Sequence, residues 1–173
     1  MELAKRMGRL GTETAFEVLA KARKLESEGK DVIHLEIGEP DFDTPQNIIK
    51  EASRALENGF THYGPSPGSV DLRSTIAEEI STTRNIDVSG DNVVVTPGGK
   101  PIMFFAILAL VDEGDEVLYP NPGFPIYESM INFVGGVPVP MRLYESKDFN
   151  INIEEVTNQI TERTKLIIVN SPN

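Results

Sequence analysis

Residues 92–124 read NVVVTPGGKPIMFFAILALVDEGDEVLYPNPGF, and this stretch decides the fold class. A β-branched run is followed by a Pro-Gly-Gly turn, an apolar segment of helical length, a second apolar run and another Pro-Gly turn. The pattern predicts a strand over residues 92–96, a helix over 101–111 and a strand over 116–119. Strand, helix and strand in succession are typical of a parallel sheet with crossover helices.

The same alternation continues toward higher numbers. We predict helices over residues 124–133 and 153–160, strands over 137–141 and 166–170, and a polar loop over 145–150. Runs such as Leu166-Ile167-Ile168-Val169 lack polar alternation, which indicates strands covered on both faces. The sequence therefore predicts an α/β fold, with a mostly parallel sheet flanked by helices.

Toward lower numbers the chain is mainly helical. The spacing of apolar residues predicts helices over residues 12–28 and 70–83, and another between Pro45, which suits a first helical turn, and Gly59. A short β-branched segment predicts one more strand over residues 32–37.

Charge, hydropathy and cysteine content disfavour several classes of function. The 173 residues carry a net charge of −11, which disfavours nucleic acid as a partner, and no apolar run approaches the length of a membrane span. Cysteine is absent, and His34 and His62 lack metal-ligand spacing, so we expect no disulfide and no metal site. With no apolar segment behind the basic start, these features favour a cytoplasmic protein.

Two turns are candidate ligand sites because each follows a predicted strand. Gly98, Gly99 and Lys100 open a helix, where free backbone N–H groups favour an anion such as phosphate. The spacing is not that of a P-loop, and a plain strand-to-helix turn is the alternative. Phe124 ends the second turn, at the carboxyl end of a strand where ligands collect in α/β sheets, or it is simply a packed aromatic ring.

Further motifs precede these turns. Gly38 begins a Gly-Glu-Pro-Asp-Phe stretch, and Tyr63 begins a Tyr-Gly-Pro-Ser-Pro-Gly stretch that is followed by Leu72-Arg73. Each could be no more than a turn or a loop residue. Arg73 is interpreted as a structural ion-pair or capping residue.

The order of these motifs, closed by Asn170-Ser171-Pro172-Asn173, resembles the N-terminal portion of class I/II, fold-type I aminotransferases, which use pyridoxal 5′-phosphate (PLP). The resemblance implies residues 1–40 as an N-terminal segment contributing to the small domain. Residues 41–173 would be the first, incomplete part of the large PLP-binding domain. Related enzymes include aspartate, alanine and aromatic aminotransferases.

The resemblance also implies roles for the candidate residues. Gly98, Gly99 and Lys100 would hold the PLP phosphate, and Phe124 would stack on the pyridine ring and border the substrate. Gly38 would admit the substrate carboxylate. Tyr63 would reach the phosphate of a neighbouring subunit, which implies a homodimer with shared active sites.

Transfer of an amino group from an amino acid to a 2-oxo acid is the implied reaction. The family's Schiff-base lysine would lie beyond Asn173, so none of the 173 residues is assigned as catalytic and the chain alone is expected to be inactive. Three alternatives stay open. One is a PLP-dependent lyase, another is a non-enzymatic module that binds phosphate or PLP or a full-length subunit, and the third is an inactive fragment.

Overall fold

The computed structural model describes residues 2–11 and 15–171. Its elements are η1 (Lys5–Arg9), α1 (Ala15–Ser27), α2 (Gln46–Glu57), α3 (Val70–Arg84), η2 (Gly90–Asn92), α4 (Gly99–Leu110), β1 (Glu116–Asn121), α5 (Ile126–Val134), β2 (Val137–Arg142), η3 (Glu145–Lys147), α6 (Ile153–Gln159) and β3 (Thr164–Ile167). The expected helices therefore form close to their predicted bounds. Residues 12–14 of the first predicted helix lie outside the described residues.

A parallel sheet is the centre of the molecule. Its strands run in the order β2-β1-β3, and β1 pairs with both neighbours. Glu116 is opposite Val137 in β2, and the register to β3 shifts between Glu116 and Val117. The predicted α/β class with a parallel sheet is confirmed. Because the strands are parallel, their carboxyl ends share one edge of the sheet.

The core lies between β1, α4 and α5. Ile107, Val117, Tyr127 and Ile131 belong to one cluster of buried side chains, and Leu166 of β3 packs against it. β1 is buried from Glu116 to Pro120, as expected for a central strand covered on both faces. α5 and α6 both contact β2, and the Gln159 side chain of α6 donates a hydrogen bond to the Pro140 carbonyl at 3.1 Å.

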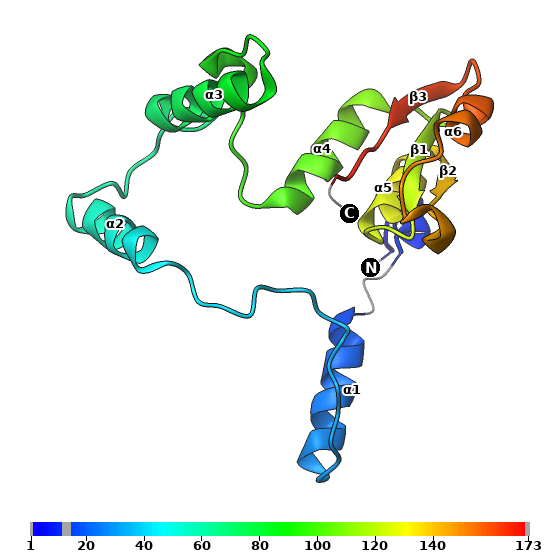
Figure 1. Ribbon diagram of the computed structural model, residues 1–173, viewed down its shortest axis with the longest axis horizontal. Helices are drawn as coiled ribbons and strands as arrows, with labels where there is room; N and C mark the ends of the chain where they lie inside the picture. The colour runs from blue at the N-terminus through cyan, green and yellow to red at the C-terminus, as the bar shows by residue number, and fades with distance from the viewer. Residues whose placement is uncertain (1, 12–14, 172–173) are drawn as a thin grey trace.

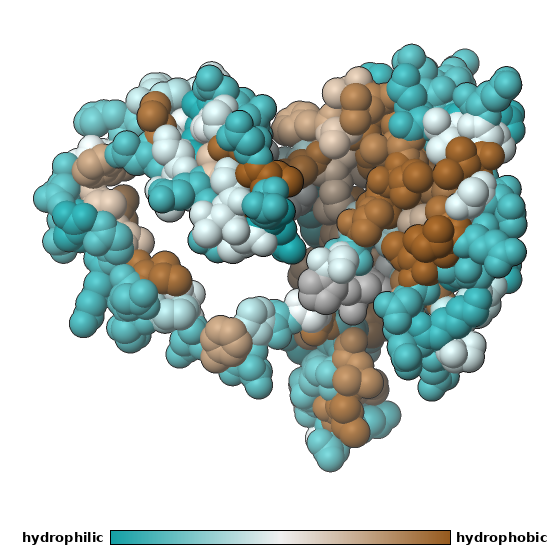
Figure 2. Space-filling model, turned by 45° about the horizontal axis from the view of Figure 1, so that its top comes forward, coloured by the Kyte–Doolittle hydropathy of each residue, from teal (hydrophilic) through white to brown (hydrophobic). Residues whose placement is uncertain are grey.

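The helices α1, α2 and α3 project away from this body as an open arc (Figure 1). α1 buries only Ala22, α3 buries only Ala77, and no residue of α2 is buried. Apolar side chains such as Phe16 and Leu56 are exposed as a result. Hydrophobic surface gathers over the sheet body and along α1 (Figure 2). Local sequence pattern was sufficient to predict these helices, although their apolar faces are not packed.

Two predicted strands are wrong. Residues 32–37 and 92–96 carry no strand, and the 65% exposed Val94 contradicts the expectation of a strand covered on both faces. A strand exists only where a neighbour completes its hydrogen-bond ladder, and the described residues supply no such neighbour to either segment. β3 likewise ends at Ile167 rather than at residue 170, and it is an edge strand with alternating exposure.

Candidate active site

The first candidate turn begins α4. Gly98 has φ +95°, its N–H donates to the Thr96 carbonyl at 2.8 Å, and the Thr96 hydroxyl donates to the Gly98 carbonyl at 2.7 Å. A Cβ placed on Gly98 or Gly99 would have no heavy atom within 4 Å. The backbone therefore makes a tight corner with open space beside both glycines. The helix begins at Gly99, two residues before the predicted Pro101, which occupies the first turn.

The electrostatics of this corner favour an anion. Gly98, the N-cap residue of α4, has no side chain to accept the first N–H groups, and the first turn contains Lys100 but no acidic residue. The positive end of the helix dipole and the lysine charge thus add at one point.

Phe124 follows the carboxyl end of β1. Gly123 makes this turn feasible, because a Cβ there would lie 2.2 Å from the Pro120 carbonyl oxygen. The Phe124 ring packs edge-on against Tyr127, with ring centroids 6.0 Å apart. The Lys100 Nζ lies 5.8 Å from the Phe124 ring centroid, a cation–π distance. The structure therefore places the Lys100 side chain, from the first turn of α4, beside the Phe124 ring.

Tyr119 belongs to the buried cluster against which Phe124 packs, and no sequence motif identifies it. Its buried hydroxyl donates to the Glu128 carboxylate at 3.0 Å and so joins β1 to α5, on either side of Phe124. Burial, followed by the Glu128 hydrogen bond and charge, raises the pKa of Tyr119 to about 12. A tyrosine and a glutamate nine residues apart carry no motif, so only the fold pairs them.

Gly38 and Tyr63 lie elsewhere in the structure. Gly38 is an exposed residue of the segment between α1 and α2, with open space where a Cβ would be. Tyr63 lies between α2 and α3 with its side chain fully exposed, at 109% of its reference area. The structure does not bring either residue to the Lys100–Phe124 corner, so their predicted roles remain predictions.

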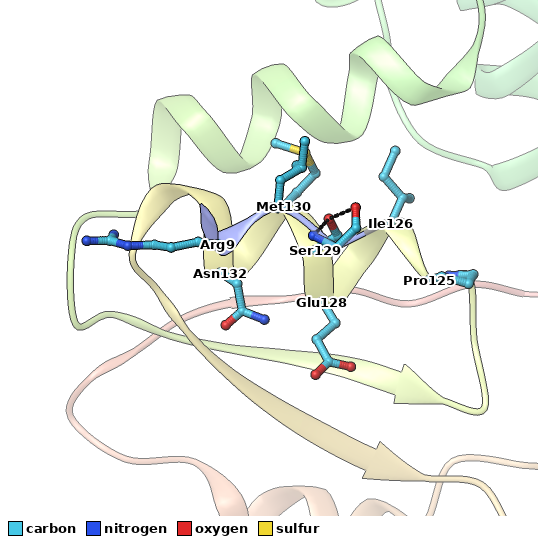
Figure 3. A pocket seen from close by; sticks show the side chains of 9 residues that line it. Arg9, Pro125, Ile126, Glu128, Ser129, Met130 and Asn132 are labelled. Atoms are coloured by element: carbon cyan, nitrogen blue, oxygen red, sulfur yellow. Dashed lines mark hydrogen bonds between the residues drawn. The ribbon is translucent and has the colours of Figure 1, made fainter. Parts of the chain in front are cut away.

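A cavity of about 440 Å³ lies between η1 and α5 (Figure 3). The Ser129 hydroxyl anchors its rim by accepting the Gly11 N–H at 2.9 Å and donating to the Gly11 carbonyl at 3.2 Å. Glu128 points toward the sheet, whereas Met130 and Ile126 point to the opposite side. Because the polar side chains around this cavity do not point into a common space, we interpret it as a gap between two packed segments and not as a ligand site.

The described residues form neither a metal-binding cluster nor a membrane-spanning helix. Within residues 2–11 and 15–171, no group of three or more His, Asp or Glu side chains is arranged to hold a metal ion. None of the helices in the described part of the chain has the length and apolar character that a membrane span requires.

Residues 30–173 match the family model described as aminotransferase class I and II. The chain belongs to this family, whose members are PLP-dependent enzymes with fold type I.

Curated relatives and a solved structure agree with this assignment. An aspartate aminotransferase of Bacillus subtilis is 40% identical over 100% of this chain and 44% of its own length. A (5-formylfuran-3-yl)methyl phosphate transaminase of Methanocaldococcus jannaschii is 42% identical over 99% of this chain and 44% of its own length. The aspartate aminotransferase of Thermus thermophilus solved with maleate superimposes with a TM-score of 0.93 at 38% identity, covering 100% of this chain and 45% of its own. The chain thus spans less than half the length of the relatives it matches, in agreement with an N-terminal portion.

The corner at α4 fits the phosphate end of PLP. A phosphate needs N–H donors, positive charge and room, and the uncapped first turn, Lys100 and the open space beside Gly98 and Gly99 supply these. A pyridine ring needs a flat apolar partner, which the half-buried Phe124 provides.

Proposed function

We propose that this chain supplies the phosphate-holding part of the active site of a PLP-dependent aminotransferase. The observation that carries the proposal is the position of the Lys100 ammonium group, 5.8 Å from the centre of the Phe124 ring, at the uncapped start of α4. One cation, one ring and a row of backbone donors border the same space. This combination suits a phosphorylated aromatic molecule better than a bare anion or a neutral ring.

In this proposal each residue binds or orients. The Gly99 N–H at the start of α4 donates to a phosphate oxygen, Gly98 leaves room beside it, and Lys100 adds a charge-assisted contact. Phe124 covers one face of the heterocycle and excludes water from it. When bound, PLP supplies the electron-withdrawing ring that makes amino-group transfer feasible.

Gly38 and Tyr63 complete the proposal. Gly38, which has open space beside its Cα, leaves room for a substrate carboxylate. Tyr63 is fully exposed, so it is available to the phosphate site of a second subunit in a homodimer. We propose residues 1–40 and 41–173 as parts of the small and the large domain, and the cytoplasm as the location of the enzyme.

The reaction is transfer of an amino group from an amino acid to a 2-oxo acid. The residues assigned above hold the cofactor, and Lys100 serves its phosphate, so none of them is assigned to proton transfer. We propose that the 173 residues bind the cofactor without turning over substrate. The two relatives described above have similar identities but different named substrates, so identity alone does not select the donor.

Binding is tested with pyridoxine 5′-phosphate, which lacks the aldehyde that would react with any lysine. Titration into ¹⁵N-labelled chain should shift the amide signals of Gly98, Gly99 and Phe124. Lys100→Met should weaken binding roughly tenfold to a hundredfold, the value of one charge-assisted contact of about 1.5–3 kcal/mol.

Two controls complete the experiment. Lys50→Met removes the same charge from α2 and should leave affinity unchanged. Pyridoxine without phosphate should bind far more weakly. Equal affinity for the two ligands, or signal shifts that avoid the α4 corner, would refute the proposed phosphate site.

A further inference from the structure

Residues 93–98, which lead into the α4 corner, lie outside the sheet. Within residues 2–11 and 15–171 they pair with no strand, so no ladder of backbone hydrogen bonds from this part of the chain fixes the approach to Gly98. Corners that bind phosphate need a fixed backbone, because their donors are N–H groups that cannot adjust independently. The residues that hold this segment in place therefore matter for the corner itself.

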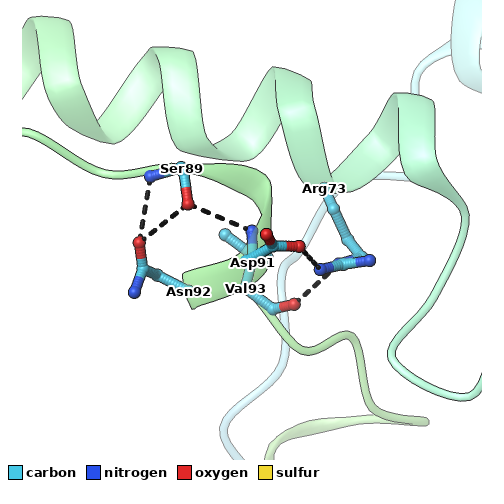
Figure 4. Close-up of polar contacts among 5 residues, drawn as sticks. All are labelled: Arg73, Ser89, Asp91, Asn92 and Val93. Carbon is cyan, nitrogen blue, oxygen red and sulfur yellow. Dashed lines mark hydrogen bonds and ion pairs between the residues drawn. The ribbon is translucent and has the colours of Figure 1, made fainter.

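Arg73 of α3 is the first of these residues (Figure 4). Its Nε donates to the Val93 carbonyl at 2.9 Å, and its Nη2 contacts the Asp91 carboxylate at 3.2 Å. The Arg73 side chain is only 13% exposed, whereas that of Asp91 is 98% exposed. The contact with Val93 therefore dominates, because solvent screens the exposed ion pair. The ion-pair role predicted for Arg73 is confirmed, and the carbonyl contact adds to it.

Gly68 holds the same segment two residues further on. The Val95 N–H donates to the Pro67 carbonyl at 2.9 Å, and a Cβ on Gly68 would lie 2.8 Å from the Val95 Cγ2. Gly68 also has φ +106°, a conformation that residues with a side chain rarely adopt. Both the backbone and the space therefore require glycine here.

A cap secures the other end of the segment. The Asn92 Oδ1 accepts the Ser89 N–H at 3.1 Å, which closes the η2 turn just before Val93. Beyond Val95, the Thr96 hydroxyl donates to the Gly98 carbonyl. Successive contacts thus connect α3 to the first residues of α4.

We propose that Arg73 is a positioning residue for the cofactor-binding corner. Arg73 lies outside the binding corner. It holds the Val93 carbonyl in place, and this fixes the path of the backbone from Val93 to the first N–H groups of α4. Gly68 supports the same segment from the loop that begins with Tyr63. This inference rests on the proposed function for its purpose, but the mechanical link is testable without any ligand.

The ligand-free test is amide hydrogen exchange on the 173-residue chain. Arg73→Met should speed exchange at Val95 and Gly98, both hydrogen-bonded amides, by roughly tenfold or more, the scale set by losing one charge-assisted bond. Ile168, whose N–H donates to the Leu118 carbonyl in the core, should change less than twofold. Arg73→Lys should restore part of the protection.

Three further variants separate positioning from general stability. Arg54→Met removes the same charge from an exposed ion pair on α2, and Asp91→Asn removes only the screened partner, so neither should alter exchange at Val95 or Gly98. Gly68→Ala should speed exchange at these two amides. Unchanged exchange in Arg73→Met would overturn the inference, and so would an equal loss of protection in α3, Val95 and the core.

The ligand arm uses pyridoxine 5′-phosphate. Arg73→Met should raise its Kd at least roughly fivefold although Arg73 lies outside the binding corner, and Arg73→Lys should recover part of the affinity. An unchanged Kd in Arg73→Met would overturn the inference. If the unmodified chain shows no binding at Gly98 and Gly99, the proposed function fails, while the exchange experiment still decides whether Arg73 positions the corner.

Discussion

Removing the Tyr119 hydroxyl should change the stability of the chain in opposite directions at neutral and at high pH. In Tyr119→Phe the buried bond to Glu128 is lost. One hydrogen bond to a charged group contributes roughly 1.5–3 kcal/mol. Glu128 is exposed and regains water, so we expect a value at or just below the lower limit of that range, about 1–1.5 kcal/mol of destabilisation at pH 8.

High pH should reverse this order. The pKa of Tyr119 rises from 10.0 to about 12 on folding, so its contribution is complete below pH 10 and is lost as pH rises toward 12. At roughly 1.4 kcal/mol per pKa unit, the wild type should lose on the order of 1 kcal/mol by pH 11 and roughly 3 kcal/mol well above pH 12. Tyr119→Phe has no phenol at this position and escapes that loss.

Urea denaturation followed by circular dichroism measures both effects. The free energies of unfolding of wild type and Tyr119→Phe should converge near pH 11 and then cross. Tyr144→Phe is the matched control, because Tyr144 also donates to a glutamate, Glu155, but in an exposed contact of 3.4 Å. Parallel pH profiles for wild type and Tyr119→Phe would refute the assignment of Tyr119 as a buried link between β1 and α5.

Two further predictions concern the core and the base of the sheet. Ile131→Ala, at a fully buried site, should lower the free energy of unfolding by roughly 2–5 kcal/mol. Ile102→Ala, at an exposed position of α4, should change it far less. Equal effects of the two variants in urea denaturation would contradict the assigned core. Glu116 accepts hydrogen bonds from Thr161 and Arg163, which lower its pKa below 4.5, so its contribution is present above pH 4.5 and is lost as pH falls through the lowered pKa. Glu116→Gln should therefore flatten the acid side of the stability profile, and an unchanged acid limb would show that Glu116 does not couple β1 to β3.

Local pattern predicted the helices because their signals are local. Apolar spacing, Pro45 and the closing Gly59 specify α2 even though none of its residues is buried. The strand predictions were correct only for segments that pair with another strand of the sheet. Residues 116–119 lie between two partner strands and form β1, whereas the β-branched residues 93–95 have no partner strand among the described residues and form no strand. A strand depends on distant residues, and a single sequence does not record which segments meet.

The residues of the candidate site also fall into two groups: those that a local motif identifies and those that only the fold brings together. Gly98, Gly99, Lys100 and Phe124 are candidates from the sequence because each follows a predicted strand or opens a helix, where ligands collect, and their roles stay predictions. The contacts that support the site, such as that between Arg73 and Val93, could not be predicted from the sequence, because they join residues that belong to no motif. Arg73 is 20 residues from Val93, and only the fold of α3 onto that segment brings its guanidinium to the carbonyl.

The position of the core along the chain has a consequence for biosynthesis. The buried cluster extends from Ile107 to Ile131 and is completed by Leu166 and Ile168, so the first hundred residues leave the ribosome before their folding nucleus exists. At roughly 5–20 residues per second, about 3–14 s pass before the last strand emerges. During that interval the apolar side chains along α1 and α2 are exposed to water, as they also are in the folded chain. Exposed apolar surface of this kind favours aggregation, so the yield of the nascent protein should fall as its concentration rises.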